Sequence, residues 1–213
     1  MRSADEPSLA VTAAARPSTP AIADRREALL ATAAERFIKV GIRKTTMEDI
    51  ARGAGAGKAT LYRHFANKDE VIAALLDREV ARLEREIARE VATSATASTR
   101  IEVALATTIA FFLNHPVLTR GRAEEPAELL ERITSSGGPL VLRLQGTFEA
   151  LVTDGIERGE LRTVDAAMAS EVLLRLATSY LAFPPLAVPV DDASQIRRLA
   201  RAVVDTGLGP ITS

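Results

Sequence analysis

The residues best suited to chemistry form a glycine-rich segment, GAGAGK, at residues 53–58. Backbone N–H groups beside glycines can cradle a phosphate, so the segment invites comparison with nucleotide-binding loops. A Walker A loop requires Gly at the position of Arg52 and Ser or Thr at that of Ala59. A dinucleotide fingerprint requires Gly at the position of Lys58 and a preceding strand. These requirements are not met, so the segment does not predict a nucleotide site.

Other common site chemistries lack the residues that they need. The 213-residue chain has no cysteine, which excludes disulfides, thiolate catalysis and cysteine-ligated metal sites. Its two histidines, His64 and His115, are 51 positions apart, and no motif links them to a metal. No G-x-S-x-G nucleophile elbow is present. We therefore expect a protein that is not an enzyme and that holds no cofactor and no metal.

Positive charge gathers in one part of the chain. Between Arg36 and Lys68 there are eight basic and two acidic residues, a local charge of +6 in a chain whose net charge is -1. Such a concentration is typical of a surface that binds nucleic acid. A basic helical hairpin that only keeps the protein soluble would have the same composition, so charge alone leaves both interpretations open.

The spacing of the elements in this window favours DNA binding. Thr45 and Thr46, followed by Glu48 and Asp49, predict the start of a short helix at 46–53. Small residues then allow a sharp turn, and a second short helix is predicted at 58–65. This is helix-turn-helix spacing, in which the second helix lies in the major groove of DNA and the first spans the backbone.

The stretch TTMEDIARGAGAGKATLYRHFANKDEV resembles the N-terminal signature of TetR-family transcriptional regulators. The resemblance covers about residues 24–75, and the rest of the chain is similar to the family only in size and helical layout. It implies a homodimeric repressor that binds a palindromic operator in double-stranded DNA and is released by a small, mainly apolar ligand. Gly57 stands at a position where members of the family frequently have a capping Ser. Glycine lacks the side chain that could contact DNA, but it is an acceptable helix cap.

Helical spacing and the resemblance together assign a role to each residue of the motif. Leu61 and Phe65 point inward. Lys58, Ala59 and Thr60 lie near the helix N-terminus, where base edges are reached. By resemblance, Thr46, Tyr62 and Lys68 meet phosphates. His64 has three interpretations: a phosphate contact, an ordinary surface histidine or a metal ligand. The expected DNA-binding residues are Thr46, Lys58, Ala59, Thr60, Tyr62, Arg63, His64 and Lys68.

The amino-acid composition predicts an all-α protein. Aromatic residues make up 4% of the chain, tryptophan is absent, and Ala, Leu, Arg and Glu dominate, which favours helices over strands. Apolar stretches are too short for a membrane helix, so we expect a cytoplasmic protein without a membrane partner.

The expected domains are a flexible arm at 1–22, a helix-turn-helix domain at 23–83 and a helical ligand-binding and dimerisation domain at 84–213. A capping box at Asp24 predicts the first helix, and later helices are expected at Lys68 to about Ala92 and at about 100–114, 126–135, 139–158, 165–183 and 192–206.

The C-terminal half carries an expected dimer surface and an expected ligand pocket. Residues 165–183 are apolar nearly all round, which requires cover on more than one side. By resemblance, this helix and the last one pair with those of a second copy, although an internal core is the alternative. The expected interface residues are Val172, Leu176, Tyr180, Ile196, Leu199 and Val203. The expected ligand-binding residues are Phe111, Asn114, His115, Gln145, Phe148 and Tyr180, of which the apolar ones fit a plain core equally well.

Two other functions remain compatible with this sequence. A DNA-binding protein that organises the chromosome would carry the same motif as a promoter regulator. A helical ligand-binding protein whose DNA function has lapsed is disfavoured by the intact Thr60, Tyr62 and Lys68.

Overall fold

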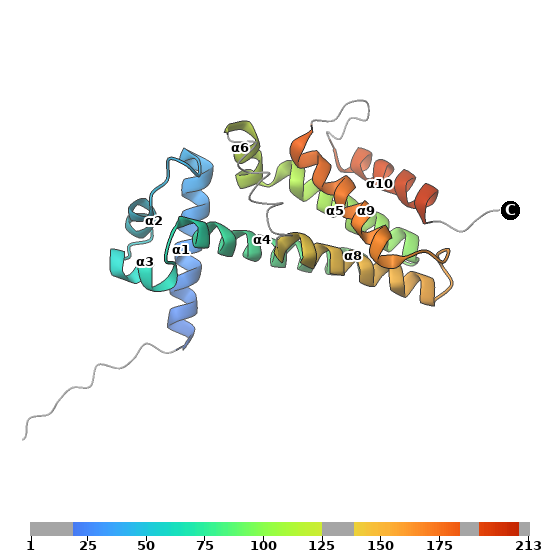
Figure 1. Cartoon of the computed structure of the whole chain (residues 1–213), viewed down its shortest axis with the longest axis horizontal. Coiled ribbons are helices and arrows are strands. Elements are labelled where there is room, and N and C mark those ends of the chain that lie inside the picture. Colours follow the sequence, from blue (N-terminus) through green and yellow to red (C-terminus); the bar gives the residue numbers. More distant parts are fainter. Residues whose placement is uncertain (1–18, 125–138, 184–191, 209–213) are drawn as a thin grey trace, which may run out of the picture.

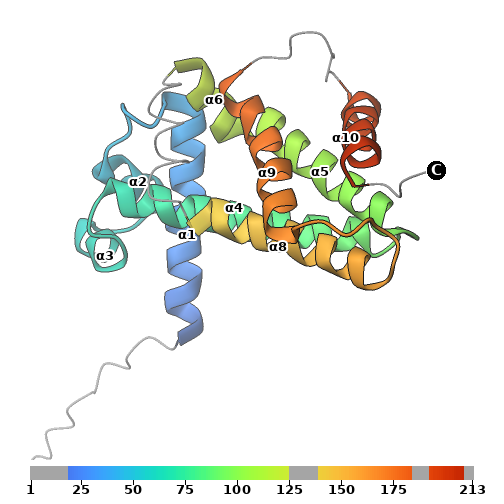
Figure 2. The ribbon, with the colours of Figure 1, turned by 45° about the vertical axis from the view of Figure 1, so that its right-hand side comes forward.

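The computed structural model describes residues 19–124, 139–183 and 192–208. Within these residues the chain forms nine helices and no strand, which confirms the expected all-α class. Figure 1 shows the first three helices gathered at one end, with the long helix α4 running from them along the rest of the molecule. The remaining helices surround α5, as the turned view of Figure 2 also shows.

The N-terminal helices match the predicted helix-turn-helix spacing. They are α1 (Thr19–Val40), α2 (Met47–Gly53), α3 (Lys58–His64) and α4 (Lys68–Val91). Helix α1 begins five residues before the expected start at Asp24, because Pro20 is tolerated in the first turn of a helix. Residues 19–22, expected in a flexible arm, are therefore helical, and residues 1–18 lie outside the described part of the chain.

The C-terminal helices are α5 (Ala97–Asn114), α6 (Pro116–Glu124), α8 (Pro139–Glu157), α9 (Ala166–Ala182) and α10 (Ala193–Gly207). Four of them match predicted helices to within a few residues. Helix α6 is not among the predicted helices. Pro116 ends the preceding helical pattern, but proline is also favoured at the first position of a helix, and here it begins α6. The helix predicted at 126–135 falls outside the described residues.

Side-chain caps explain where several helices begin. Thr46, Asn67, Thr96, Asp165 and Asp192 each accept a hydrogen bond from a backbone N–H in the first turn of the helix that follows. These N–H groups have no partner within their own helix, so each cap satisfies a donor that would otherwise need water.

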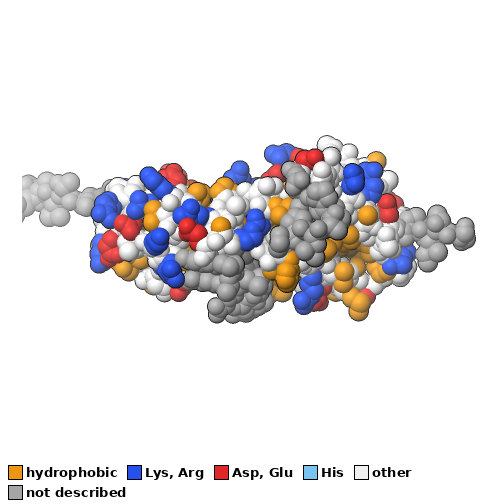
Figure 3. Space-filling view, turned by 90° about the horizontal axis from the view of Figure 1, so that it is seen from above, with side chains coloured by type: hydrophobic (Ala, Val, Ile, Leu, Met, Phe, Trp, Pro, Cys, Tyr) orange, Lys and Arg blue, Asp and Glu red, His pale blue; other side chains and the backbone are white. Residues whose placement is uncertain are grey.

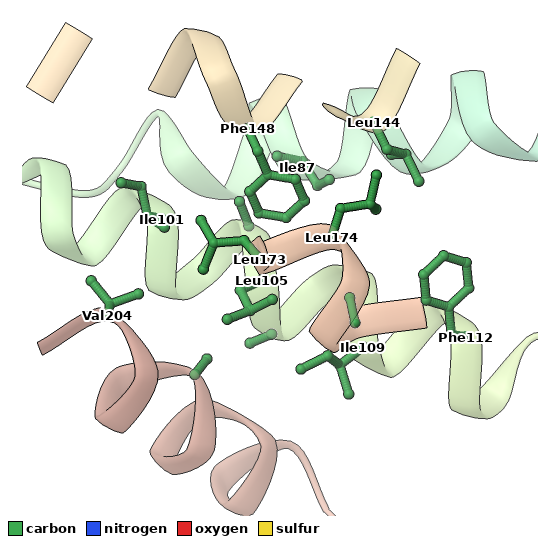
Figure 4. Packing of buried hydrophobic residues seen from close by; sticks show 14 of the residues in the cluster. Ile87, Ile101, Leu105, Ile109, Phe112, Leu144, Phe148, Leu173, Leu174 and Val204 are labelled. Carbon is green, nitrogen blue, oxygen red and sulfur yellow. The ribbon is translucent and has the colours of Figure 1, made fainter. Parts of the chain in front are cut away.

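Two hydrophobic cores divide the molecule, and α4 belongs to both. The first core packs α1, α2 and α3 around Phe37, Ile50 and Leu61. The second surrounds α5, and Figure 4 shows Phe148 of α8 and Leu173 of α9 packed among its residues. The first half of α4 contributes Val71, Ile72 and Leu75 to the first core, and its second half contributes Val80, Leu83 and Ile87 to the second.

Helix α6 joins the two units at a second place. Val117 of α6 belongs to the hydrophobic core of the N-terminal unit. Arg122 of the same helix donates hydrogen bonds to the backbone oxygens of Leu113 and Tyr180, both at 3.1 Å. The helix is therefore tied to the ends of α5 and α9 while it packs against α1.

A chain of charged groups crosses the same junction. Glu27 of α1 pairs with Arg78 of α4 at 2.7 Å, and Arg78 pairs with Glu79 at 2.7 Å. The second oxygen of Glu79 lies 3.3 Å from Nε2 of His115, at the end of α5. We call these four residues the junction network; it connects the first helix of the N-terminal unit to the corner between α5 and α6.

Two residues expected at functional surfaces are instead inside the C-terminal core. Ile196, expected at a dimer surface, is 2% exposed and packs within its own chain, because α10 lies against α5. Phe148, expected at a ligand pocket, is fully buried among core side chains. Helical periodicity places both residues on apolar helix faces, but it does not show which surface each face packs against.

No single helix in the described residues is long and apolar enough to cross a membrane. Taken together, α5 and α6 have the length and composition of a membrane-spanning segment, but the chain bends by 54° between them.

We expect stability to fall as the pH falls below about 6.5, the ordinary pKa of histidine. Burial lowers the pKa of His115, against the opposing pull of Glu79, so the folded chain resists a proton that the unfolded chain accepts. Burial also lowers the pKa of His64, so two residues contribute. Melting temperatures measured from pH 7.5 to 5.5 should decrease, and His115→Gln should decrease less. If His115→Gln leaves the dependence of melting temperature on pH unchanged, His115 of the junction network is not a source of that dependence.

Candidate nucleic-acid interface

The N-terminus of α2 is held rigidly by a capping box. The backbone N–H of Asp49 donates to Oγ1 of Thr46 at 3.1 Å, and the backbone N–H of Thr46 donates to Oδ2 of Asp49 at 3.1 Å. The Thr46 hydroxyl also donates to the same carboxylate at 2.7 Å, and these bonds lower the pKa of Asp49. Thr46 is exposed, so the first turn of α2 is presented on the surface in a fixed position.

The glycine-rich segment serves the turn between α2 and α3. Gly55 adopts a φ of +60°, in the left-handed region that favours glycine. A Cβ atom at Gly53 would lie 2.7 Å from the Cγ2 atom of Thr32, so glycine here permits α2 to approach α1 closely. The segment therefore sets the angle between two short helices.

Helix α3 has one buried side and one exposed side. Leu61 is 0% exposed and Phe65 is 2% exposed, which confirms that both point into the N-terminal core. The opposite face is available to solvent. It carries exposed Lys58, Ala59, Tyr62 and Arg63, with half-buried Thr60 at its margin. The structure thus brings five of the expected DNA-binding residues together on one helix face.

Lys58 is held at the edge of this face by an acidic neighbour from α2. Its Nζ atom lies 2.7 Å from Oε1 of Glu48 and 5.7 Å from the centre of the Tyr62 ring. The hydrogen bond between them lowers the pKa of Glu48 and raises that of Lys58. Both side chains are largely exposed, and such pairs are weak. Lys58 can therefore exchange this partner for DNA at small cost.

His64 is placed differently from the rest of α3. The side chain is half-buried, and its Nε2 atom is buried without a hydrogen-bond partner among the described residues. Burial and then the charge of Arg63 lower its pKa, so the ring is neutral at pH 7. A neutral ring whose Nε2 atom is buried does not favour the expected phosphate contact. The described residues also contain no group of three or more side chains that could hold a metal ion.

Lys68 is occupied by the protein backbone. Its Nζ atom donates to the carbonyl oxygens of Ile42 at 3.0 Å, Arg43 at 3.3 Å and Thr45 at 3.3 Å. An ammonium group has three N–H donors, so these three bonds account for all of them. The first residue of α4 thereby fixes the loop that leads to Thr46. This arrangement differs from the phosphate contact expected for Lys68.

Charge on the surface follows the charge of the sequence. Figure 3 shows Lys and Arg side chains over the end of the molecule that holds α1, α2 and α3, with acidic and some hydrophobic side chains among them. Further Lys and Arg side chains lie over the C-terminal helices, together with more of the hydrophobic side chains. A polyanion is therefore attracted to the end of the molecule that also exposes the polar face of α3.

The residues expected at a ligand pocket are only partly brought together. Phe111, Asn114 and His115 line a cavity of about 520 Å³ between α1, α4 and the corner of α5 and α6. Gln145 and Tyr180 are half-buried and do not line it. Burial raises the pKa of the Tyr180 hydroxyl.

Comparison with protein families identifies the N-terminal unit. Residues 29–75 match the family described as bacterial regulatory proteins, tetR family. The match spans α2, α3, most of α1 and the start of α4. It coincides with the first hydrophobic core and the exposed face of α3.

Individual regulators are also similar to this chain. The transcriptional repressor KstR2 of Mycobacterium tuberculosis is 50% identical over 52 residues, which cover 24% of this chain and 26% of KstR2. The regulator YhgD of Bacillus subtilis is 24% identical over 157 residues, which cover 72% of this chain and 80% of YhgD. The chain thus aligns with about a quarter of the length of KstR2.

A solved structure shares the whole fold. The transcriptional regulator FadR from Bacillus subtilis, in complex with stearoyl-CoA, superposes with a TM-score of 0.66 at 16% identity. The superposition covers 85% of this chain and 98% of FadR. At this identity the likeness concerns the arrangement of helices.

Replacing Lys68 with Met should weaken DNA binding without changing its dependence on salt. The lost bonds hold the loop before Thr46, and no phosphate counterion is involved, so the slope of log affinity against log salt should stay constant. Arg63→Met, which removes an exposed charge on α3 that has no assigned base contact, is the matched control, for which we expect the slope to fall by about one. A comparable fall for Lys68→Met would show that Lys68 binds phosphate after all.

Proposed function

We propose that this chain, whose N-terminal domain matches the tetR family of bacterial regulatory proteins, binds a palindromic operator in double-stranded DNA as a homodimer. In this proposal the bound protein represses transcription in the cytoplasm, and a small, mainly apolar effector releases it. We propose a helix-turn-helix domain that begins with α1 and extends to residue 83, followed by a C-terminal ligand-binding and dimerisation domain from residue 84. The observation that carries the proposal is the exposed face of α3 beside a basic surface.

Helix α3 has the form required of a helix that binds in the major groove of DNA. It is seven residues long, its inner side is anchored by Leu61, and its outer side presents Lys58, Thr60 and Tyr62. Residues at the N-terminal end of such a helix reach base edges, while those further along contact the backbone. Lys58 and Thr60 therefore read sequence, and Tyr62 positions the helix.

An exposed apolar strip on α9 supports a homodimer. Met168 is 65% exposed and Val172 is 58% exposed, four residues apart on the same face. Leu176 continues this line and is half-buried, as are Leu199 and Val203 on α10. Two reading helices must lie about 34–36 Å apart to occupy successive half-sites, which a two-fold axis provides.

The names of similar proteins support an apolar effector. FadR was solved with stearoyl-CoA, and a structure of KstR2 is described as that of a ketosteroid transcriptional regulator. Both names refer to compounds with large apolar parts. An effector that prefers a conformation with wrongly spaced α3 helices lowers DNA affinity by the ratio of its affinities for the two states.

Substitutions on α3 should separate base contacts from phosphate contacts. We expect Tyr62→Phe to weaken binding to an operator and to random DNA by a similar factor. Thr60→Ala should instead weaken the operator complex by about tenfold and random DNA little, since one base contact contributes about 1–3 kcal/mol. Binding isotherms on both DNAs measure this. Equal factors for Thr60→Ala on the two DNAs would contradict its reading role.

Val172→Glu should convert the dimer to a monomer without unfolding it. The side chain is exposed within one chain, so a carboxylate is tolerated there, but it opposes burial against a second copy. Sedimentation at micromolar concentration measures the state, and circular dichroism checks the fold. Ala88→Glu, exposed on α4, is the control and should remain dimeric. A wild-type monomer would contradict the proposed dimer.

A further inference from the structure

The cavity at the junction of the two units is the starting point. Its volume of about 520 Å³ lies in the range typical of small-molecule sites. Helix α1 supplies Ile38 to its wall, α6 supplies Val117, and α4 supplies Arg78 and Arg82. The three helices that join the N-terminal unit to the C-terminal unit therefore meet around one space.

One part of the wall is apolar and incompletely covered. Ile38 is 39% exposed, although it lies beside the fully packed Phe37 on α1. Phe111 is half-buried, and its ring centre lies 4.8 Å from that of His115. Together with Val117 these side chains form a surface that gains free energy when an apolar group displaces water from it.

The polar part of the wall contains two arginines and two glutamates, and one of the arginines has no ion-pair partner among the described residues. The two oxygens of Glu79 are already engaged by Arg78 and His115, and Arg78 is also paired with Glu27. Arg82 lines the cavity and has no ion-pair partner among the residues that the structure describes. Burial lowers the pKa of His115 most; the charge of Glu79 raises it, and the charges of Arg82 and Arg78 lower it by less. Glu86, one turn beyond Arg82, also lines the cavity and is exposed.

We propose that this junction cavity binds an amphipathic organic carboxylate, with its carboxylate at Arg82 and its apolar part against Ile38, Val117 and Phe111. The carboxylate pairs with a guanidinium that has no other partner, which avoids breaking an existing ion pair. His115 can take up a proton to strengthen the contact, because an added negative charge favours its charged form. The site is separate from the packed core that surrounds Phe148.

The position of the site connects binding to DNA affinity, a consequence that depends on the proposed function. The ligand touches α1 on one side and the α5–α6 corner on the other, so its affinity depends on how the two units are placed. A conformation that changes the spacing of the α3 helices also changes this cavity. By linkage, ligand binding and DNA binding then alter each other by the same factor.

The test uses the full chain with three probes of equal chain length: decanoate, decanol and decylamine. Isothermal titration calorimetry should show that decanoate binds the wild type more tightly than either of the others. Arg82→Gln should weaken decanoate binding about tenfold, the effect of losing one charge-assisted pair. Arg85→Gln, which is also exposed on α4 but does not line the cavity, should change it less than about twofold.

A second variant tests the apolar wall independently. Ile38→Trp adds volume at an exposed position and should abolish decanoate binding while the melting temperature stays close to that of the wild type. The proposal is overturned if Arg82→Gln and Arg85→Gln behave alike, if decylamine binds best, or if Ile38→Trp binds decanoate normally.

DNA binding is measured separately, so that the two proposals can fail separately. A wild-type chain that binds operator DNA but shows no Arg82-dependent decanoate binding overturns the cavity site alone. A chain that binds decanoate through Arg82 but binds no DNA supports the cavity site and overturns the proposed function. Saturating decanoate that leaves operator affinity unchanged overturns the link between the two sites.

Discussion

The burial of Leu61 and Phe65 is the constraint on which the reading surface depends. A helix of seven residues is too short to be stable alone in water, so α3 exists because its inner side packs against Phe37 and Ile50. The glycine at position 53 lets α2 come close to α1, and Gly55 allows the chain to reverse. The exposed face of α3 is therefore a product of the core behind it, and any change in that core moves the surface that meets DNA.

Charge around this surface performs two tasks. Some basic groups are available to a polyanion, as Lys58 is, because its pair with Glu48 is exposed and weak. The ammonium group of Lys68 instead donates hydrogen bonds to three backbone carbonyl oxygens and fixes the loop before α2. A count of bases predicts attraction to DNA but does not distinguish a group that contacts a phosphate from one that positions its neighbours.

The elements with local signals were predictable from sequence. The helix-turn-helix followed from caps, glycines and the inward pair Leu61 and Phe65, all of which act within a few residues. Helix α6 was missed because Pro116 both ends one pattern and begins the next. The burial of Ile196 and Phe148, the cavity at the junction and the network from Glu27 to His115 depend on contacts between distant segments, which no local pattern specifies.

In this molecule, α4, α6 and a chain of charged groups join a small basic unit to a larger helical body. We propose that α3 lies in the major groove of DNA, twice per dimer. Because the chain has no cysteine, Ala59→Cys provides a single thiol on the exposed face of α3, to which a DNA-cleaving iron chelate can be attached. The account predicts cleavage at two places about one helical turn apart, and none from the same reagent at Ala202→Cys on α10. Cleavage without preferred positions, or cleavage from position 202 instead, would contradict it.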